Sequence, residues 1–274
     1  MTAEQKSDAA RLLDIAGDYL RDGYRRDREA PVFSDDPSPQ VLPQALPQAR
    51  SAKSVMGAAP EHDTPDAVAA AIDGCTGCQL CKTRTKAVGG EGAGQPLVLV
   101  VGEGPGADED ASGRPFVGKA GQLLDKMLAS IGLFRDTNCF IANVVKCRPP
   151  GNRDPLPEEI AACAPFLARQ IALLRPLVIL CAGRFAAQTL LHTAEGIGRL
   201  RGRFGVYSPD YPAITDHVTL GRSGVPIPIL PTYHPSALLR DETLKRPAWE
   251  DLKTLRAKLI EMDDTYARET EGLH

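Results

Sequence analysis

The sequence predicts an α/β fold, a three-layer αβα sandwich whose central sheet is mainly parallel and four-stranded. Two observations carry this prediction. Four short apolar runs alternate with longer segments of helical periodicity, which is typical of a parallel sheet with helices on both faces. The first run is continuously apolar, as expected for a strand that helices cover on both sides. The runs span residues 97–102, 139–145, 177–183 and 227–233.

Helices are predicted between and after these runs. The first spans about residues 118–131, where apolar residues recur at helical spacing. The second spans residues 157–174 and opens on a proline, a residue favoured in the first turn of a helix. The third strand leads into a helix that ends at Leu191, and a final helix spans about residues 247–268.

The last strand and the segment before it are less regular. Pro228 and Pro231 interrupt the fourth run, and proline cannot donate a hydrogen bond to a neighbouring strand. We therefore expect this strand at a sheet edge or at a bulge. Residues 199–225 are poorly periodic, and we expect a strand pair among them.

Three regions are predicted along the chain. Residues 1–29 form an amphipathic helix, which either binds an unknown protein or is a simple tail. Residues 30–65 are rich in Pro, Ala and Gln and are predicted to be a disordered linker. Residues 66–274 form the folded domain, which begins near Thr64 because a threonine followed by proline resembles a helix start.

Composition and charge are those of an ordinary soluble protein. No apolar run approaches the roughly 20 residues of a membrane span, and the N-terminus lacks a secretory pattern. We therefore expect a cytoplasmic protein without membrane contact. Residues 1–66 contain eight Lys/Arg and twelve Asp/Glu, so they carry −4 of the net charge of −3 and the remainder carries +1. This balance neither supports nor excludes a nucleic-acid partner.

Four of the seven cysteines form two pairs with the spacing of metal ligands. Cys75 and Cys78 form a C-x2-C motif, and fifteen residues separate Cys147 from Cys163. Two thiolate pairs can bind a tetrahedral zinc ion or an iron–sulfur cluster, and the spacing does not distinguish them. Cys81 is either a fifth thiol near this site or a cysteine that takes no part in it.

The remaining cysteines give no sign of disulfides. The chain has seven cysteines in all, and an odd number disfavours a complete disulfide framework. Cys139 and Cys181 lie inside apolar runs, so they are predicted to be small buried hydrophobic side chains.

A glycine-rich turn, Gly102–Gly106, follows the first strand directly. It lacks the spacing of a dinucleotide-binding fingerprint, because Pro105 and the acidic run 108–110 intervene. Such a turn instead lets backbone N–H groups approach a ligand closely, with carboxylates nearby to hold water. Phe116 either stacks on a planar base or packs into the core at a helix start.

Two polar side chains at strand ends suit the binding of a nucleic-acid base. Asn143 lies at the end of the second strand, where it either caps a turn or offers the donor and acceptor that the edge of uracil requires. His234 follows the fourth strand, where it is either a structural residue or an imidazole that stabilises negative charge on a departing base. Ser236 can bond a phosphate oxygen, and Leu238 can wedge into a base stack. Ligands of parallel sheets bind at the carboxyl ends of strands, so we expect one shared site.

Basic residues gather near the same loops. Each alone can be an ordinary solvated cation, but their position beside strand ends favours contact with phosphate. They are Lys82, Arg84, Lys86, Lys146, Arg148, Arg153, Arg199, Arg201, Arg203, Arg240, Lys245 and Arg246.

Together these features resemble the family 4 uracil-DNA glycosylases, the iron–sulfur branch of the uracil-DNA glycosylase superfamily. The resemblance covers about residues 70–260. Each motif alone is modest, but four in order with the cysteines are highly specific. The motifs are 102–110 (GEGPGADED), 113–118 (GRPFVG), 143–150 (NVVKCRPP) and 234–236 (HPS).

The resemblance implies a uracil pocket built from these motifs. Glu103 and the backbone of Gly104 would line the pocket. Phe116 would stack on uracil, and Asn143 would hydrogen-bond its edge. The aspartate that the better-known branch of the superfamily carries in this turn is replaced here by Gly104, so the residue that activates water must lie elsewhere.

The resemblance also implies the catalytic groups and the reaction. His234 would stabilise the negative charge at O2 of uracil, with Ser236 beside it contacting the substrate, and Glu109 would position the attacking water. The catalytic residues would be Glu109, His234 and Asn143. The enzyme would hydrolyse the N-glycosidic bond of uracil in single- or double-stranded DNA. It would leave an abasic site that initiates base excision repair, and we expect it to act as a monomer.

The resemblance further implies that four cysteines hold a 4Fe–4S cluster in a structural role. These ligands would be Cys75, Cys78, Cys147 and Cys163. A related branch that traps uracil covalently has a histidine-containing insertion after the asparagine strand. Here the segment 148–153 is short and has no histidine, which favours turnover.

Two other classes of function stay open at this point. One is a non-catalytic or uracil-trapping nucleic-acid-binding protein with an iron–sulfur or zinc site. The other is a nucleotide-binding oxidoreductase that uses the cluster for electron transfer, which the interrupted glycine pattern disfavours.

Overall fold

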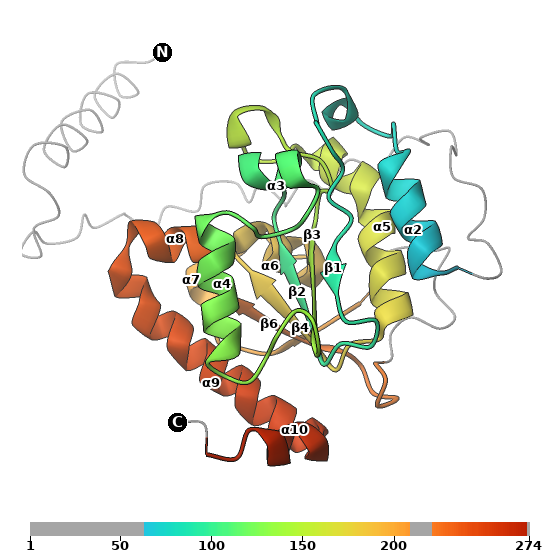
Figure 1. Cartoon of the computed structure of the whole chain (residues 1–274). Helices are drawn as coiled ribbons and strands as arrows, with labels where there is room; N and C mark the ends of the chain where they lie inside the picture. Colours follow the sequence, from blue (N-terminus) through green and yellow to red (C-terminus); the bar gives the residue numbers. More distant parts are fainter. Residues whose placement is uncertain (1–62, 209–220, 273–274) are drawn as a thin grey trace, which may run out of the picture. The chain divides into compact units, whose positions relative to one another are not determined.

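The structure, a computed structural model, describes residues 63–208 and 221–272 (Figure 1). The helix predicted over residues 1–29, and the linker predicted over residues 30–65 except its last three positions, lie outside the described residues. In the described part, helices pack on both faces of a central sheet (Figure 1), which confirms the predicted α/β sandwich.

The sheet has six strands in the order β1-β3-β2-β4-β6-β5. Two short strands lie at its edges, where β1 (Glu91–Gly92) pairs antiparallel with β3 and β5 (Gly205–Val206) pairs antiparallel with β6. The predicted number of four strands is therefore wrong, because a two-residue strand carries no recognisable alternation of side chains. The four inner strands are parallel and match the predicted ones: β2 (Val98–Gly102), β3 (Cys139–Asn143), β4 (Val178–Ala182) and β6 (Pro228–Thr232).

The edge position predicted for β6 is also wrong. This strand pairs with β4 on one side and β5 on the other, but β5 covers only Pro228 and Ile229. The carbonyl of Pro231 accepts a hydrogen bond from the N–H of Gly202, past the end of β5. Because the N–H and C=O of a strand residue point to the same side, the N–H that Pro231 lacks would also lie past β5. No ladder hydrogen bond is lost there.

The strand pair predicted within residues 199–225 is only partly represented. The described part of that range contains β5, whose partner is β6 rather than a strand of the same segment. Residues 209–220 lie outside the described residues.

Longer helices follow the predictions closely. They are α4 (Lys119–Ala129), α5 (Pro157–Leu174) and α6 (Arg184–Leu191). The predicted last helix is two helices, α9 (Lys245–Met262) and α10 (Asp264–Glu269). The break has a clear cause: Asp263 leaves helical geometry and its carboxylate accepts a hydrogen bond from the N–H of Tyr266, which caps α10.

Shorter helices complete the described chain. The first, α2 (Pro65–Asp73), begins as the sequence predicts, because the hydroxyl of Thr64 accepts a hydrogen bond from the N–H of Ala67 over 3.1 Å. The others have too few residues for a periodic pattern. They are α3 (Ala107–Ser112), α7 (Ile197–Leu200) and α8 (Pro235–Arg240), with the 3-10 helices η1 (Gln79–Lys82), η2 (Pro150–Asn152) and η4 (Glu242–Leu244).

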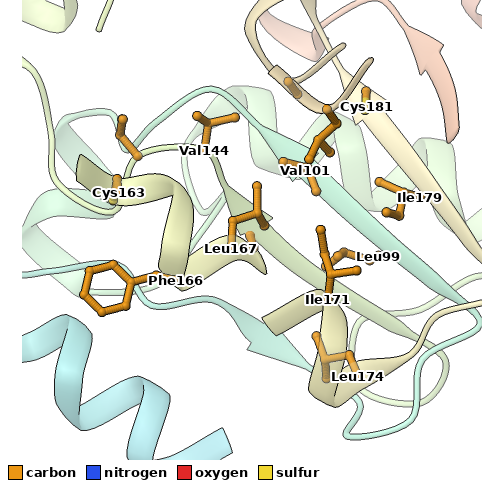
Figure 2. Close-up of a cluster of buried hydrophobic side chains, with 14 of the residues drawn as sticks. Leu99, Val101, Val144, Cys163, Phe166, Leu167, Ile171, Leu174, Ile179 and Cys181 are labelled. Carbon is orange, nitrogen blue, oxygen red and sulfur yellow. The ribbon is translucent and has the colours of Figure 1, made fainter. Parts of the chain in front are cut away.

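Two apolar clusters hold the layers together, one on each face of the sheet. Side chains alternate along β2, so Val98 and Val100 join the cluster under α4 and α9, while Leu99 and Val101 join the cluster under α2, α5 and α6. Figure 2 shows the second cluster, in which Ile171 of α5 packs near Leu99. None of the helices in the described residues combines the length and apolar character needed to cross a membrane.

Shortening a buried side chain of this cluster should destabilise the fold. Ile171 is fully buried between α5 and the sheet, so Ile171→Ala should lower the free energy of unfolding by about 2–5 kcal/mol. Ile260 on α9 is 39% exposed and provides a matched control, for which the same change should cost far less. Urea denaturation of both variants measures this, and equal losses would contradict the described packing.

Candidate active site and cysteine cavity

The carboxyl ends of the parallel strands bring the predicted pocket residues together. Gly102 at the end of β2 pairs in register with Asn143 at the end of β3. On the other side, Ala182 of β4 pairs with Thr232 of β6, and His234 follows two residues later. Segments far apart in the sequence therefore meet at one edge of the sheet, as predicted for a ligand site.

The absence of a side chain at Gly102 creates the contact between these segments. A β-carbon placed on Gly102 would lie 2.4 Å from the Oδ1 of Asn143 and 2.5 Å from the Cζ of Phe116. Any other residue at this position would therefore displace the amide or the ring. The rings of Phe116 and His234 lie 5.5 Å apart between centroids at an angle of 33°. Phe116 thus lies beside both Gly102, at the strand end that carries Asn143, and His234.

Asn143 carries an unsatisfied polar atom. Its side chain is buried, and its Oδ1 has no hydrogen-bond partner among the described residues. A buried carbonyl oxygen without a partner costs about 1–3 kcal/mol, and such a cost is common where a ligand supplies the missing donor. The amide is therefore arranged for a ligand that offers an N–H group.

The ring of Phe116 is fixed through its backbone. The residue has a φ of 52°, in the left-handed region that side chains other than glycine rarely adopt. The guanidinium of Arg135 donates to the carbonyls of Pro115 and Phe116 over 3.1 and 3.0 Å. The ring belongs to the apolar cluster under α4, as one of the two roles predicted for Phe116 requires, and it also lies against Gly102.

Glu109 lies in the short helix α3 and braces the same turn. One carboxylate oxygen accepts from the N–H of Gly106 over 3.0 Å. The other accepts from the N–H groups of Val117 and Gly118 over 2.9 and 3.0 Å. Three of the roughly four acceptor positions of a carboxylate are thus occupied, which leaves one for a water molecule.

His234 is held in one tautomer. Its Nδ1 accepts a hydrogen bond from the backbone N–H of Ser236 over 3.1 Å and lies 2.8 Å from the Ser236 hydroxyl. Because a backbone N–H can only donate, Nδ1 carries no proton and the neutral ring carries it on Nε2. Burial lowers the pKa of His234 to about 4, with Arg240 also lowering it and Glu109 raising it. At neutral pH the ring is neutral and offers Nε2–H as a donor.

Glu103 and Gly104 follow Gly102 in the turn after β2. Burial and the negative charge of Asp154 together raise the pKa of Glu103 to about 7, against the lowering effect of Arg184. The carboxyl group is thus close to half protonated at neutral pH. A β-carbon on Gly104 would lie 2.7 Å from the Cγ2 of Val145, so a larger residue would push the turn away from β3.

One residue suggested for DNA contact is placed differently from the prediction. Leu238 is only 2% exposed, because it faces inward from α8, so it cannot wedge into a base stack. The neighbouring Leu239 is 49% exposed on the outer side of the same helix. A six-residue helix is too short for its sequence to show which of two adjacent leucines faces inward.

One predicted phosphate contact is wrong, because Lys146 is buried. Three of the other predicted cations already have partners in the fold. Arg201 forms an ion pair with the buried Asp251 over 2.6 Å, and Arg153 forms one with the buried Glu159 over 2.7 Å. Arg84 contacts a cysteine.

The four predicted ligand cysteines line one small cavity on the α2 and α5 side of the sheet. Its volume is about 10 Å³, and Cys81 lines it as well. η1 and the loop before it bring Cys75, Cys78 and Cys81 to this cavity, while Cys147 follows β3 and Cys163 lies in α5.

Hydrogen bonds to sulfur characterise this cavity. The guanidinium of Arg84 donates to the Sγ of Cys147 over 3.0 Å, and the N–H of Lys146 donates to the Sγ of Cys163 over 3.2 Å. Burial raises the pKa of Cys163 to about 11. Within the described residues, no three His, Cys, Asp or Glu side chains are arranged to bind a single metal ion. The donor set itself, thiols with N–H groups directed at sulfur, fits an iron–sulfur cluster.

Some residues of the site give little signal in the sequence. Gly183, with a φ of 98°, lies against His234, since a β-carbon there would be 2.9 Å from the Cβ of the histidine. Its position at the end of a strand run is the only available hint. Arg135 and Lys146 look like ordinary surface cations in the sequence, and only the folded chain shows what they hold.

The buried neutral state of His234 predicts a pH-dependent stability. Its pKa of about 4 in the folded chain lies below the ordinary 6.5, so between these values only the unfolded chain binds the proton. Stability should therefore rise with pH through this window, and His234→Gln should lose that contribution. Urea denaturation of both proteins across the window measures it. Identical pH profiles, or a ring that titrates near its ordinary pKa by NMR, would contradict the buried placement.

Comparisons with known proteins identify the family of this chain. The model of the uracil DNA glycosylase superfamily matches residues 90–253. The chain is 42% identical to a type-4 uracil-DNA glycosylase of Archaeoglobus fulgidus, over 69% of this chain and 90% of that protein. It is 39% identical to a type-4 uracil-DNA glycosylase of Saccharolobus solfataricus, over 72% and 87%. It is 41% identical to one of Thermotoga maritima, over 67% and 88%. This chain belongs to the uracil DNA glycosylase superfamily, with the type-4 enzymes.

Proposed function

We propose that this chain is a uracil-DNA glycosylase that hydrolyses the N-glycosidic bond of uracil in DNA and thereby initiates base excision repair. The observation that carries the proposal is the position of the Phe116 ring, which lies against Gly102 together with the Asn143 amide and 5.5 Å from the His234 ring. The family membership of the chain supports it. The DNA substrate is either single- or double-stranded, and the enzyme acts as a cytoplasmic monomer.

Recognition of the base follows from the chemistry of Asn143 and Phe116. Uracil presents an imide N–H between two carbonyls, and the partnerless Oδ1 of Asn143 is the acceptor that this N–H needs. The amide NH₂ of the same side chain can donate to the adjacent carbonyl. The flat face of Phe116 suits a base that has left the helix, because everted bases stack on aromatic rings.

Departure of the base follows from the state of His234. Cleavage of the glycosidic bond places negative charge on the oxygens of uracil and positive charge on the sugar. The neutral ring, with its proton on Nε2, can donate to the charged oxygen without giving up that proton. A fixed donor of this kind lowers the barrier by roughly 3–4 kcal/mol. Ser236 holds the ring in this tautomer through its backbone N–H.

In this proposal two carboxyl groups act on the attacking water and on the sugar. Glu109 keeps one acceptor position for the attacking water while its other bonds hold the turn that carries Phe116. Glu103 lines the pocket beside the turn at Gly104. Both follow β2 along the chain, and a carboxylate near the sugar opposes the positive charge that develops there.

The thiols of the cysteine cavity favour a 4Fe–4S cluster, which Cys75, Cys78, Cys147 and Cys163 would hold. Such a cluster would join the loop before η1 to the end of β3 and to α5, and its contribution would be to the stability of these segments. Cys81 lines the same cavity and stays outside the proposed ligand set. The glycosidic bond is broken by the residues of the pocket alone.

A purified-protein assay tests the proposed activity directly. The wild-type chain should convert a single-stranded, uracil-containing oligonucleotide into an abasic product that alkali cleaves. Absence of product, with Asn143→Ala and His234→Ala binding the oligonucleotide like the wild type, would overturn the proposal in favour of a non-catalytic binding protein. A stable covalent adduct with the DNA would instead favour a uracil-trapping protein.

Exchange of one amide donor for an acceptor should weaken the selectivity for uracil. Asn143→Asp should lower kcat/KM on uracil by roughly 10²-fold, because the new carboxylate repels the carbonyl that the amide NH₂ contacted. The ratio of activity on uracil to activity on cytosine should fall as well, because cytosine has an amino donor where uracil has that carbonyl. Gln122→Glu, an amide-to-acid change at an exposed position of α4, should alter neither value. Unchanged selectivity in Asn143→Asp would remove Asn143 from the pocket.

Loss of a proposed cluster ligand should affect stability more than chemistry. Cys147→Ala should abolish the visible absorption of an iron–sulfur cluster and lower the melting temperature, because three segments lose their common link. Cys139→Ala changes a buried cysteine of β3 outside the cavity and should keep the absorption. A Cys147→Ala protein that is cluster-free yet as stable as wild type would contradict the structural role.

A further inference from the structure

A fully buried lysine lies between the cysteine cavity and the base pocket. Lys146 is 1% exposed, although lysine is almost never found buried without a partner charge. No Asp or Glu carboxylate forms an ion pair with it among the described residues. The residue follows Asn143 by three positions and directly precedes the proposed ligand Cys147.

The side chain of Lys146 turns back to the strand end that carries the pocket amide. Its Nζ donates to the backbone carbonyl of Asn143 over 2.8 Å and to the Oε1 of Gln170 over 2.7 Å. Gln170, in α5, donates in turn to the carbonyl of Gly89 over 2.5 Å. These contacts form a continuous buried chain of hydrogen bonds from α5 to the last residue of β3.

The backbone of Lys146 is also fixed, both at its N–H and at its carbonyl. Its N–H donates to the Sγ of Cys163, and its carbonyl accepts from the N–H of Val88 over 2.8 Å. Lys146 therefore touches a proposed cluster ligand through its main chain and the pocket strand through its side chain. A buried ammonium also gains from nearby sulfur ligands that carry negative charge.

We propose that Lys146, held by Gln170, is a positioning residue that fixes Asn143 for the base and ties the cysteine cavity to the pocket. The inference rests on the proposed function and adds a residue to it. Without the bond from Nζ, the carbonyl of Asn143 is left buried and unpaired, and the end of β3 is free to move. A displacement of about 1 Å in a binding group can cost about 10²-fold in rate.

The test uses the holoenzyme and three substitutions to methionine, which resembles lysine and glutamine in length. Lys146→Met removes the donor, and Gln170→Met removes its second acceptor but keeps the lysine. Lys126→Met, at an exposed position of α4, is the matched control. For each protein the measurements are iron content and visible absorption, KM and kcat on a single-stranded uracil oligonucleotide, inhibition by free uracil, and hydrogen exchange.

We expect Lys146→Met to retain the cluster and to raise KM and the inhibition constant of free uracil by at least about tenfold, since both report the position of Asn143. Gln170→Met should shift both constants in the same direction by a smaller factor, and Lys126→Met should shift neither. The backbone N–H groups of Val144 and Val145 bond to the carbonyls of Gly102 and Glu103, so they should exchange faster in the first two variants only.

A purely structural lysine gives a different result. The melting temperature would then fall while KM, the inhibition constant and the exchange of Val144 and Val145 stayed at their wild-type values, and that outcome would overturn the proposal. Loss of the cluster in Lys146→Met, with normal constants in Gln170→Met, would also overturn it. Failure of the proposed glycosylase function can be told apart from failure of the Lys146 proposal. In the first case the wild type itself releases no uracil, while the hydrogen exchange of Val144 and Val145 still tests whether Lys146 holds the end of β3.

Discussion

The parallel pairing of β2 and β3 is the constraint on which the candidate site depends. Their register sets Gly102 opposite Asn143, and the missing side chain of Gly102 lets the amide and the Phe116 ring approach the same point. A shift of one residue would turn the side chain of Asn143 to the other face of the sheet. The apolar runs that bury both strands therefore also determine where the polar group of the pocket lies.

Much of this arrangement can be predicted from the sequence, because the inner strands and the longer helices are defined by local patterns. Continuous apolar runs predict β2 and β4, and Pro157 predicts the start of α5. The short elements escape prediction for a physical reason. The acidic run of α3 resembles a solvated loop, and its function as a brace depends on the backbone N–H groups of Val117 and Gly118, which only the folded turn brings to Glu109. Likewise, nothing local distinguishes Leu238 from Leu239.

Lysine and arginine residues show most clearly which contacts cannot be predicted from the sequence. A lysine or arginine in a sequence is most simply interpreted as a surface charge, and the basic residues near strand ends suggest phosphate contacts. In the folded chain Arg201 and Arg153 neutralise buried carboxylates, Arg84 donates to a cysteine, and Lys146 is enclosed. These partners come from other elements, so their identity depends on tertiary packing rather than on spacing. The segment 143–147 consequently serves two sites, with the pocket amide at its start and a cavity cysteine at its end.

A crystal structure of the protein with free uracil would test the central claim most directly. The account predicts that the base lies against the ring of Phe116, with its imide N–H bonded to the Oδ1 of Asn143 and a carbonyl oxygen facing the Nε2 of His234. Uracil bound at another place, with Asn143 Oδ1 still lacking a partner, would contradict it.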